Sequence, residues 1–160
     1  MYFWNLQKLI EDLRLNKVTA VQYKNYYIAS SILILFSFFA VIVSPEQPLR
    51  INFAVFLINV GLLISWTNAI FKANGAEQGK NFLNRFVALY FPIVLRIAVV
   101  YLVVLMMFAA VWSLGAHLID GQVKNYIDQY LETILDPIFS FIVYWRIYKA
   151  MQLVNKPLAP

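Results

Sequence analysis

Three carboxylates near the C-terminal end of the chain are the residues best placed to do chemistry. Asp128, Glu132 and Asp136 follow one another at intervals of four, which puts them on one face of a helix. They lead into an apolar segment that ends at Trp145. Carboxylates inside a membrane-spanning helix are costly, so we expect them to have a hydrogen-bonding partner or to act on protons or ions.

Catalysis by these carboxylates is not expected. Asp128 and Glu132 lie side by side on the helix, whereas the two carboxylates of a glycosidase face each other across the substrate. An intramembrane aspartyl protease needs carboxylates on two facing helices, and no other apolar segment carries one. The chain has no G-x-S-x-G or H-E-x-x-H motif, and with no cysteine and His117 as its single histidine it offers no metal site. The sequence predicts a protein that is not an enzyme and has no cofactor.

The composition is that of a membrane protein. Hydrophobic residues make up 62% of the 160 positions and charged residues 13%, whereas charged residues are about 25% of an ordinary soluble domain. The net charge of +5 comes from basic residues scattered between apolar runs, without a dense basic patch. We therefore expect the lipid bilayer, and not nucleic acid, to be the partner of this chain.

Four apolar runs have about the 20 residues that a helix needs to cross a bilayer. We predict an all-α protein with four transmembrane spans, at residues 26–43, 51–71, 97–115 and 126–145. The first run is longer than the apolar part of a signal peptide, so we interpret it as a retained span. The short segment between the first two runs contains two prolines and predicts that these spans are antiparallel neighbours.

The spans belong to one transmembrane domain, predicted at residues 19–155, with an N-terminal helix at 1–18 and a tail at 156–160. Residues 2–15 carry apolar side chains at helical spacing and charged residues on the other face. This amphipathic helix either lies on the inner membrane surface or docks against another helix or subunit. Thr19 and Gln22 fit a capping box that starts the next helix.

The segment that holds the third span is too long for one straight crossing. We expect residues 82–95 to form an interfacial helix that bends near Pro92, with Arg96 among the headgroups and the span at 97–115. In the alternative register the span starts near Phe86 and Arg96 lies mid-membrane, where an arginine costs at least about 2.5 kcal/mol.

The distribution of Lys and Arg predicts that both termini are cytoplasmic, in a bacterial inner membrane. In this topology eleven of the thirteen basic residues lie on the inner side, against three acidic residues there. The resulting excess of positive charge could bind a cytosolic partner or anionic lipid. The residues we assign to this docking face are Lys8, Arg14, Lys72, Lys80, Arg85, Arg146 and Lys149.

Depth singles out one of the three carboxylates. Counting back from Trp145 puts Asp136 about 13 Å inside the membrane, level with Asn59 of the second span. Three roles stay open: Asp136 is neutral or is hydrogen-bonded to Asn59, Tyr101 or a hydroxyl; the acidic stripe of several copies lines a pore; or Asp136 pairs with Arg96. Asp128 and Glu132 are expected nearer the outer water.

Four short-looped spans with a basic inner face are similar to small membrane subunits of bacterial multiprotein systems, including antiphage defence complexes. This resemblance of architecture implies a non-enzymatic subunit that self-associates and docks a cytosolic partner, as a sensor or an anchor. The alternative is an oligomeric cation channel or membrane-disrupting effector that uses the acidic stripe of the fourth span.

Overall fold

The computed structural model describes residues 2–43, 48–115 and 121–156, and for residues 40–43, 114 and 121–133 it describes the backbone alone. Regular structure in these residues is entirely helical, as predicted. The elements are α1 (Leu6–Arg14), α2 (Ala20–Val43), α3 (Leu49–Ala73), the short 3-10 helix η1 (Ala76–Gln78), α4 (Phe82–Gly115) and α5 (Gly121–Val154).

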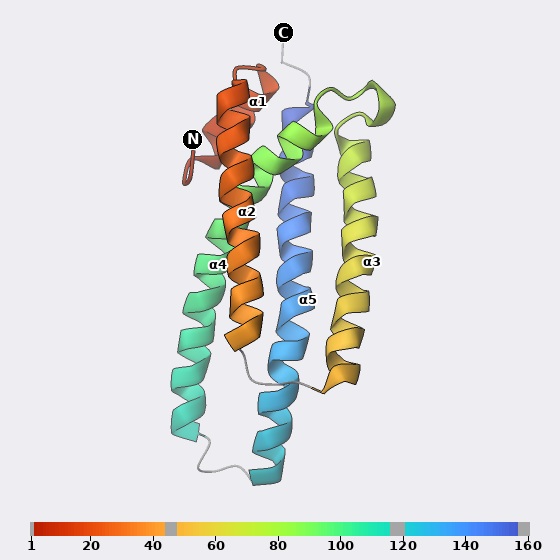
Figure 1. Ribbon diagram of the computed structural model, residues 1–160. Coiled ribbons are helices and arrows are strands. Elements are labelled where there is room, and N and C mark those ends of the chain that lie inside the picture. Colours follow the sequence, from red (N-terminus) through yellow and green to blue (C-terminus); the bar gives the residue numbers. More distant parts are fainter. Residues whose placement is uncertain (1, 44–47, 116–120, 157–160) are drawn as a thin grey trace.

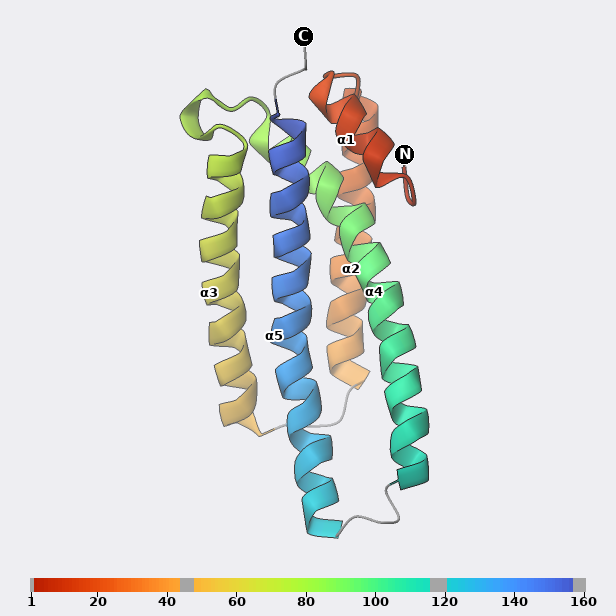
Figure 2. The same ribbon diagram turned by 180° about the vertical axis from the view of Figure 1, so that it is seen from behind.

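The long helices are arranged around α5 (Figures 1 and 2). α5 packs against α3 on one side and α4 on the other, while α2 packs against α4. α1 lies across the end where α2 begins and α5 finishes, and it contacts both α4 and α5. The start of α1 and the end of α5 therefore lie at the same end of the bundle, which we call the basic end.

The prediction that the first two spans are neighbours is wrong. α2 and α3 run antiparallel, but they make little or no contact, and α5 is visible between them in Figure 1. The connecting segment of five residues has a maximal reach of about 17–18 Å, at about 3.3–3.6 Å per residue. Because helix axes in contact are only about 8–10 Å apart, this segment is long enough to leave a gap between the two helices.

The hydrophobic core lies at the basic end. Leu9 and Leu13 of α1 are completely buried, and they belong to one cluster with Ile70 of α3, Leu89 of α4 and Ile147 of α5. The amphipathic helix predicted at the N-terminus thus docks on helices of its own chain. The predicted capping box is confirmed, since the backbone N–H of Thr19 donates to Gln22 (2.9 Å) and that of Gln22 donates to the Thr19 hydroxyl (3.3 Å).

Away from the basic end the helices expose apolar side chains. Two helices among the described residues are long and apolar enough to cross a bilayer: α3, with a mean hydropathy of 1.8, and Phe82–Ser113 of α4, with 2.6. Only 6% of the most apolar window of each is buried, whereas the core helix of a soluble protein would be mostly buried. These helices contain the second and third predicted spans.

α4 is one helix of 34 residues with Pro92 inside it. Its first turns slant across the bundle before the rest runs parallel to the other helices (Figure 1). Proline has no N–H to donate to the carbonyl four residues earlier, which accounts for a change of direction near Pro92. Ala88, Leu89 and Ile93 are buried in the core, so residues 82–95 pack on the chain's own helices, and their interfacial position stays a prediction.

Candidate functional site

The structure brings together two polar residues that the sequence placed at one depth. Asn59 of α3 donates a hydrogen bond from Nδ2 to Oδ2 of Asp136 on α5, over 2.7 Å. This contact is one of the pairings predicted for Asp136. Tyr101 lies on α4, and its ring packs against that of Phe139, with 5.2 Å between centroids.

The predicted alternative of an ion pair between Asp136 and Arg96 is not formed within the described residues. Arg96 instead shares a groove with Arg146. Arg146 lies ten residues further along α5, which is about 15 Å at about 1.5 Å per residue. The side chains of Asp128 and Glu132 lie outside the described residues, so the rest of the acidic stripe has no structural account here.

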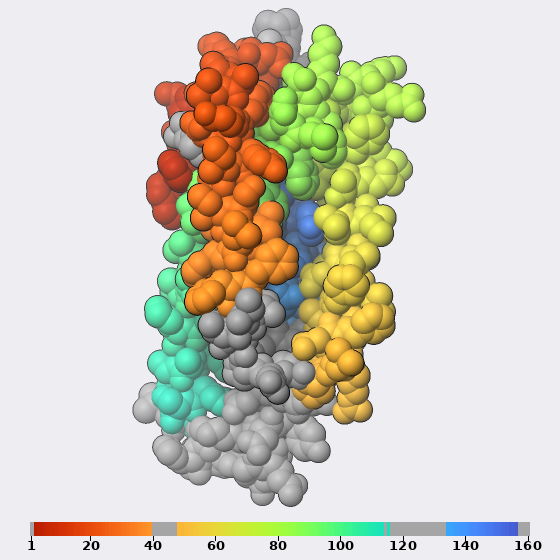
Figure 3. Space-filling model, in the orientation of Figure 1, coloured from red at the N-terminus to blue at the C-terminus, as the bar shows by residue number. Residues whose placement is uncertain are grey.

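Asp136 belongs to the face of α5 that forms the core elsewhere. Val143, Ile147 and Val154 follow it at spacings of 7, 11 and 18 residues, which keeps them on its side of the helix, and all three are buried. Asp136 itself is exposed. Figure 3 shows α5 at the floor of a hollow between α2 and α3.

Placing this exposed carboxylate in apolar surroundings is energetically unfavourable. Its one described hydrogen bond comes from Asn59, whose Oδ1 is buried and has no partner among the described residues. The pair therefore has unused hydrogen-bonding capacity. It can bind one more donor, such as a protonated side chain or a polar group of another helix.

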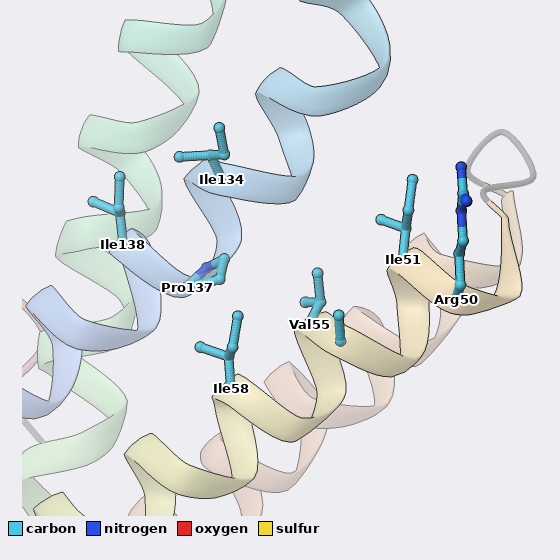
Figure 4. Close-up of a pocket in the computed structure, with 8 residues that line it drawn as sticks. Arg50, Ile51, Val55, Ile58, Ile134, Pro137 and Ile138 are labelled. Carbon is cyan, nitrogen blue, oxygen red and sulfur yellow. The ribbon is translucent and has the colours of Figure 1, made fainter.

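The opposite face of α5 is apolar. Ile134 and Ile138 face Ile51, Val55 and Ile58 of α3 across a pocket of about 640 Å³ (Figure 4). Arg50 is the one charged residue among those that line it. α3 therefore contributes both the amide that bonds Asp136 and the apolar side chains that face Ile134 and Ile138.

Basic residues of the predicted docking face gather at the basic end. The side chains of five of them are exposed there: Lys8, Lys72, Lys80, Arg146 and Lys149. Arg14 is half-buried in α1. No ion pair joins any of the five to a carboxylate within the described residues, so their charges are available to a ligand.

Arg85 does not belong to this docking face. It is 7% exposed, and its guanidinium donates to Oδ1 of Asn74 (3.0 Å) and to Oδ1 of Asn16 (3.3 Å). Asn74 is completely buried at the end of α3, and its Nδ2 donates to the carbonyl oxygen of Lys80 (3.4 Å). Arg85 thus ties α4 to the end of α3 and to the turn after α1, which is a structural role.

Sequence reasoning missed this asparagine and arginine cluster. The signal available in the sequence was the pair of glycines around η1, Gly75 and Gly79. Gly75 has a φ of +100°, and a Cβ on Gly79 would lie 2.3 Å from the carbonyl oxygen of Asn74. Such close backbone packing needs glycine and marks a folded loop.

The N-terminal segment is held by hydrogen bonds that sequence reasoning also missed. The Tyr2 hydroxyl donates to Oδ2 of Asp12 (2.6 Å), and the backbone N–H of Tyr2 donates to the hydroxyl of Tyr26 (2.7 Å). The bond to Asp12 raises the pKa of Tyr2 above its ordinary value, because ionised Tyr2 could no longer donate it.

No group of three His, Cys, Asp or Glu residues that could hold a metal occurs in the described part of the chain. Comparisons with protein-family models, with curated proteins and with solved structures found no match for this chain. The described geometry offers two chemical features, an uncovered carboxylate with an amide partner and a set of unpaired cations at one end.

Proposed function

We propose that this chain is a non-enzymatic integral membrane subunit, which self-associates through the exposed part of α5 around Asp136 and holds a cytosolic partner at its basic end. The observation that carries this proposal is the exposure of Asp136 on the core face of α5. The proposed setting is a multiprotein system of the bacterial inner membrane, such as antiphage defence, by resemblance of architecture alone.

The exposed apolar surface supports insertion of all four long helices. α2 has 24 residues, about 36 Å at about 1.5 Å per residue, and it exposes Phe36, Phe38 and Phe39 by 66%, 63% and 58%. A bilayer core is about 30 Å thick, so this length is sufficient. Exposed apolar residues also line the middle of α5, including Ile138 and Phe141. In water such a surface would aggregate, whereas lipid covers it at no cost.

The charge distribution supports a cytoplasmic basic end. Both termini of the helical bundle and the η1 loop lie at this end, together with the exposed lysines and Arg146 (Figure 1). Arg50 lies at the opposite end of α3. The positive-inside rule then directs the basic end toward the cytoplasm, where a negatively charged partner surface would meet it.

The geometry of Asp136 supports association with a second copy. A two-fold axis along the membrane normal keeps every residue at its own depth, so Asn59 of one copy is level with Asp136 of the other. The second N–H of Asn59 Nδ2 in one copy can then donate to the other carboxylate oxygen of Asp136 in its partner. Burial of these groups against a partner helix removes their contact with lipid, which favours the oligomer.

Replacing Asp136 with leucine tests self-association. The oligomeric mass in mild detergent, measured by native mass spectrometry, should fall toward that of the monomer, while Asp136→Asn should keep more of the oligomer because an amide still hydrogen-bonds. Met106→Leu, at an exposed position of α4, is the matched control and should leave the mass unchanged. A wild-type protein that is monomeric at all concentrations would refute self-association.

Reversing the charges of Lys72 and Lys80 to glutamate tests partner docking. Both side chains are exposed, so the fold should survive, and the amount of native partner that co-purifies with the chain should fall. Arg50→Glu reverses a charge at the other end and serves as the control. Arg85 is left unchanged because it is buried. Equal recovery from all variants would count against docking at the basic end.

A cation channel is the second candidate function, favoured by the exposure of Asp136. Copies arranged around an axis would direct this carboxylate into a shared pathway and attract cations. Asp136→Asn and Glu132→Gln should then change cation selectivity in planar bilayers. A purified oligomer without conductance would exclude this function.

A further inference from the structure

Two adjoining grooves meet at Arg96 and Arg146, on the side of α4 and α5 where α1 docks. The first groove, of about 350 Å³, lies between α1 and the two long helices, and it adds Lys149 and Trp4 to the two arginines. The second, of about 410 Å³, runs from the arginines between α4 and α5. Both are lined by the same two arginines, so we treat them as one site with two chemically different parts.

The first part is positively charged and lacks a counter-ion. None of its three cations forms an ion pair with a carboxylate within the described residues. Nε of Arg96 is buried and has no hydrogen-bond partner there. Three positive charges that line one groove repel each other, and a bound anion would offset this repulsion. Arginine binds phosphate through two parallel hydrogen bonds, which makes a phosphate group the best fit.

The second part is apolar. Val100, Val104 and Ile97 of α4 face Ile138 and Ile142 of α5 along it. An inorganic anion would leave this groove unfilled, whereas a hydrocarbon chain would cover it. The 63% exposure of Trp4 at the mouth suits the headgroup level of a bilayer, where tryptophan is favoured.

We infer that the joined grooves bind one anionic phospholipid, with its phosphate between Arg96 and Arg146 and one acyl chain between α4 and α5. This inference rests on the membrane insertion proposed above, but it does not require self-association or a cytosolic partner. A bound lipid would also fill the space between α1 and the long helices and so hold α1 at the headgroup level.

Native mass spectrometry of the full chain in mild detergent tests the site, with phosphatidylglycerol, phosphatidylcholine of the same chain length and inorganic phosphate as probes. A cation near an anionic lipid contributes on the order of a fivefold gain in affinity, so Arg96→Gln with Arg146→Gln should weaken phosphatidylglycerol binding by about 25-fold. The matched control, Lys72→Gln with Lys80→Gln, removes two exposed cations outside the grooves and should change binding by less than about threefold.

Val100→Trp fills the apolar groove without changing any charge, and it keeps the test decisive if the arginine variant does not fold. It should weaken phosphatidylglycerol binding and leave phosphate binding unchanged. Equal affinity of wild type and arginine variant for phosphatidylglycerol would overturn the headgroup assignment. Competition by inorganic phosphate at the same concentration as the lipid would overturn the acyl-chain assignment. Resistance of the wild type to alkaline carbonate extraction reports insertion separately, so failure of the lipid site is distinguishable from failure of the membrane proposal.

Discussion

Replacing Arg85 with methionine is expected to destabilise the basic end strongly. Methionine keeps most of the aliphatic length of arginine but removes the hydrogen bonds to Asn74 and Asn16. A hydrogen bond from a charged group contributes about 1.5–3 kcal/mol, and the longer bond to Asn16 contributes less. Oδ1 of Asn74 would be left buried without this partner, so the total loss is about 3 kcal/mol.

Thermal unfolding in detergent, followed by helical circular dichroism, measures this effect. For a chain of this size each kcal/mol shifts Tm by about 2–4 °C, so Arg85→Met should lower Tm by about 6–12 °C. Lys72→Met is the matched control, because this side chain is exposed and a surface substitution changes stability by about 0.5 kcal/mol or less. A double-mutant cycle with Asn74→Ala should give a coupling of about 1–2 kcal/mol. A Tm of Arg85→Met within about 2 °C of wild type would refute the structural role.

Two further predictions concern the η1 loop and the N-terminal segment. Gly79→Ala should cost about 1–3 kcal/mol, because its Cβ would lie 2.3 Å from the carbonyl oxygen of Asn74. Gly61→Ala, with no neighbour within 4 Å of the new Cβ, should instead stabilise α3 by about 0.5–1 kcal/mol, and unfolding of the two variants compares them directly. The raised pKa of Tyr2 means that the folded state favours the neutral form of this side chain. The resulting stabilisation of the folded state is complete below the ordinary pKa of 10.0, and it is lost as the pH rises through the higher pKa of the folded state. Limited proteolysis of the N-terminal segment should therefore increase above about pH 10 in wild type, and Tyr2→Phe, which cannot donate to Asp12, should remove this pH dependence.

Several features of the fold follow from local sequence alone. Helix formation, the capping box at Thr19 and the bend near Pro92 depend on residues within one or two turns of each other. The common depth of Asn59 and Asp136 was also predictable, because the rise of a helix converts a count of residues into a distance. Hydropathy and charge likewise depend on composition along the chain, and they carry the prediction of a membrane protein.

Tertiary structure decided which faces meet. Nothing local in the sequence distinguishes buried Arg85 from exposed Lys80, since the difference depends on Asn74 and Asn16 from two other elements. The short loop between α2 and α3 is compatible both with helices in contact and with helices apart. Only the tertiary structure shows that they are apart, with α5 between them. The exposure of Asp136 was likewise not predictable from the sequence, which sets the chemistry of each helical face, whereas contacts between distant segments set what covers that face.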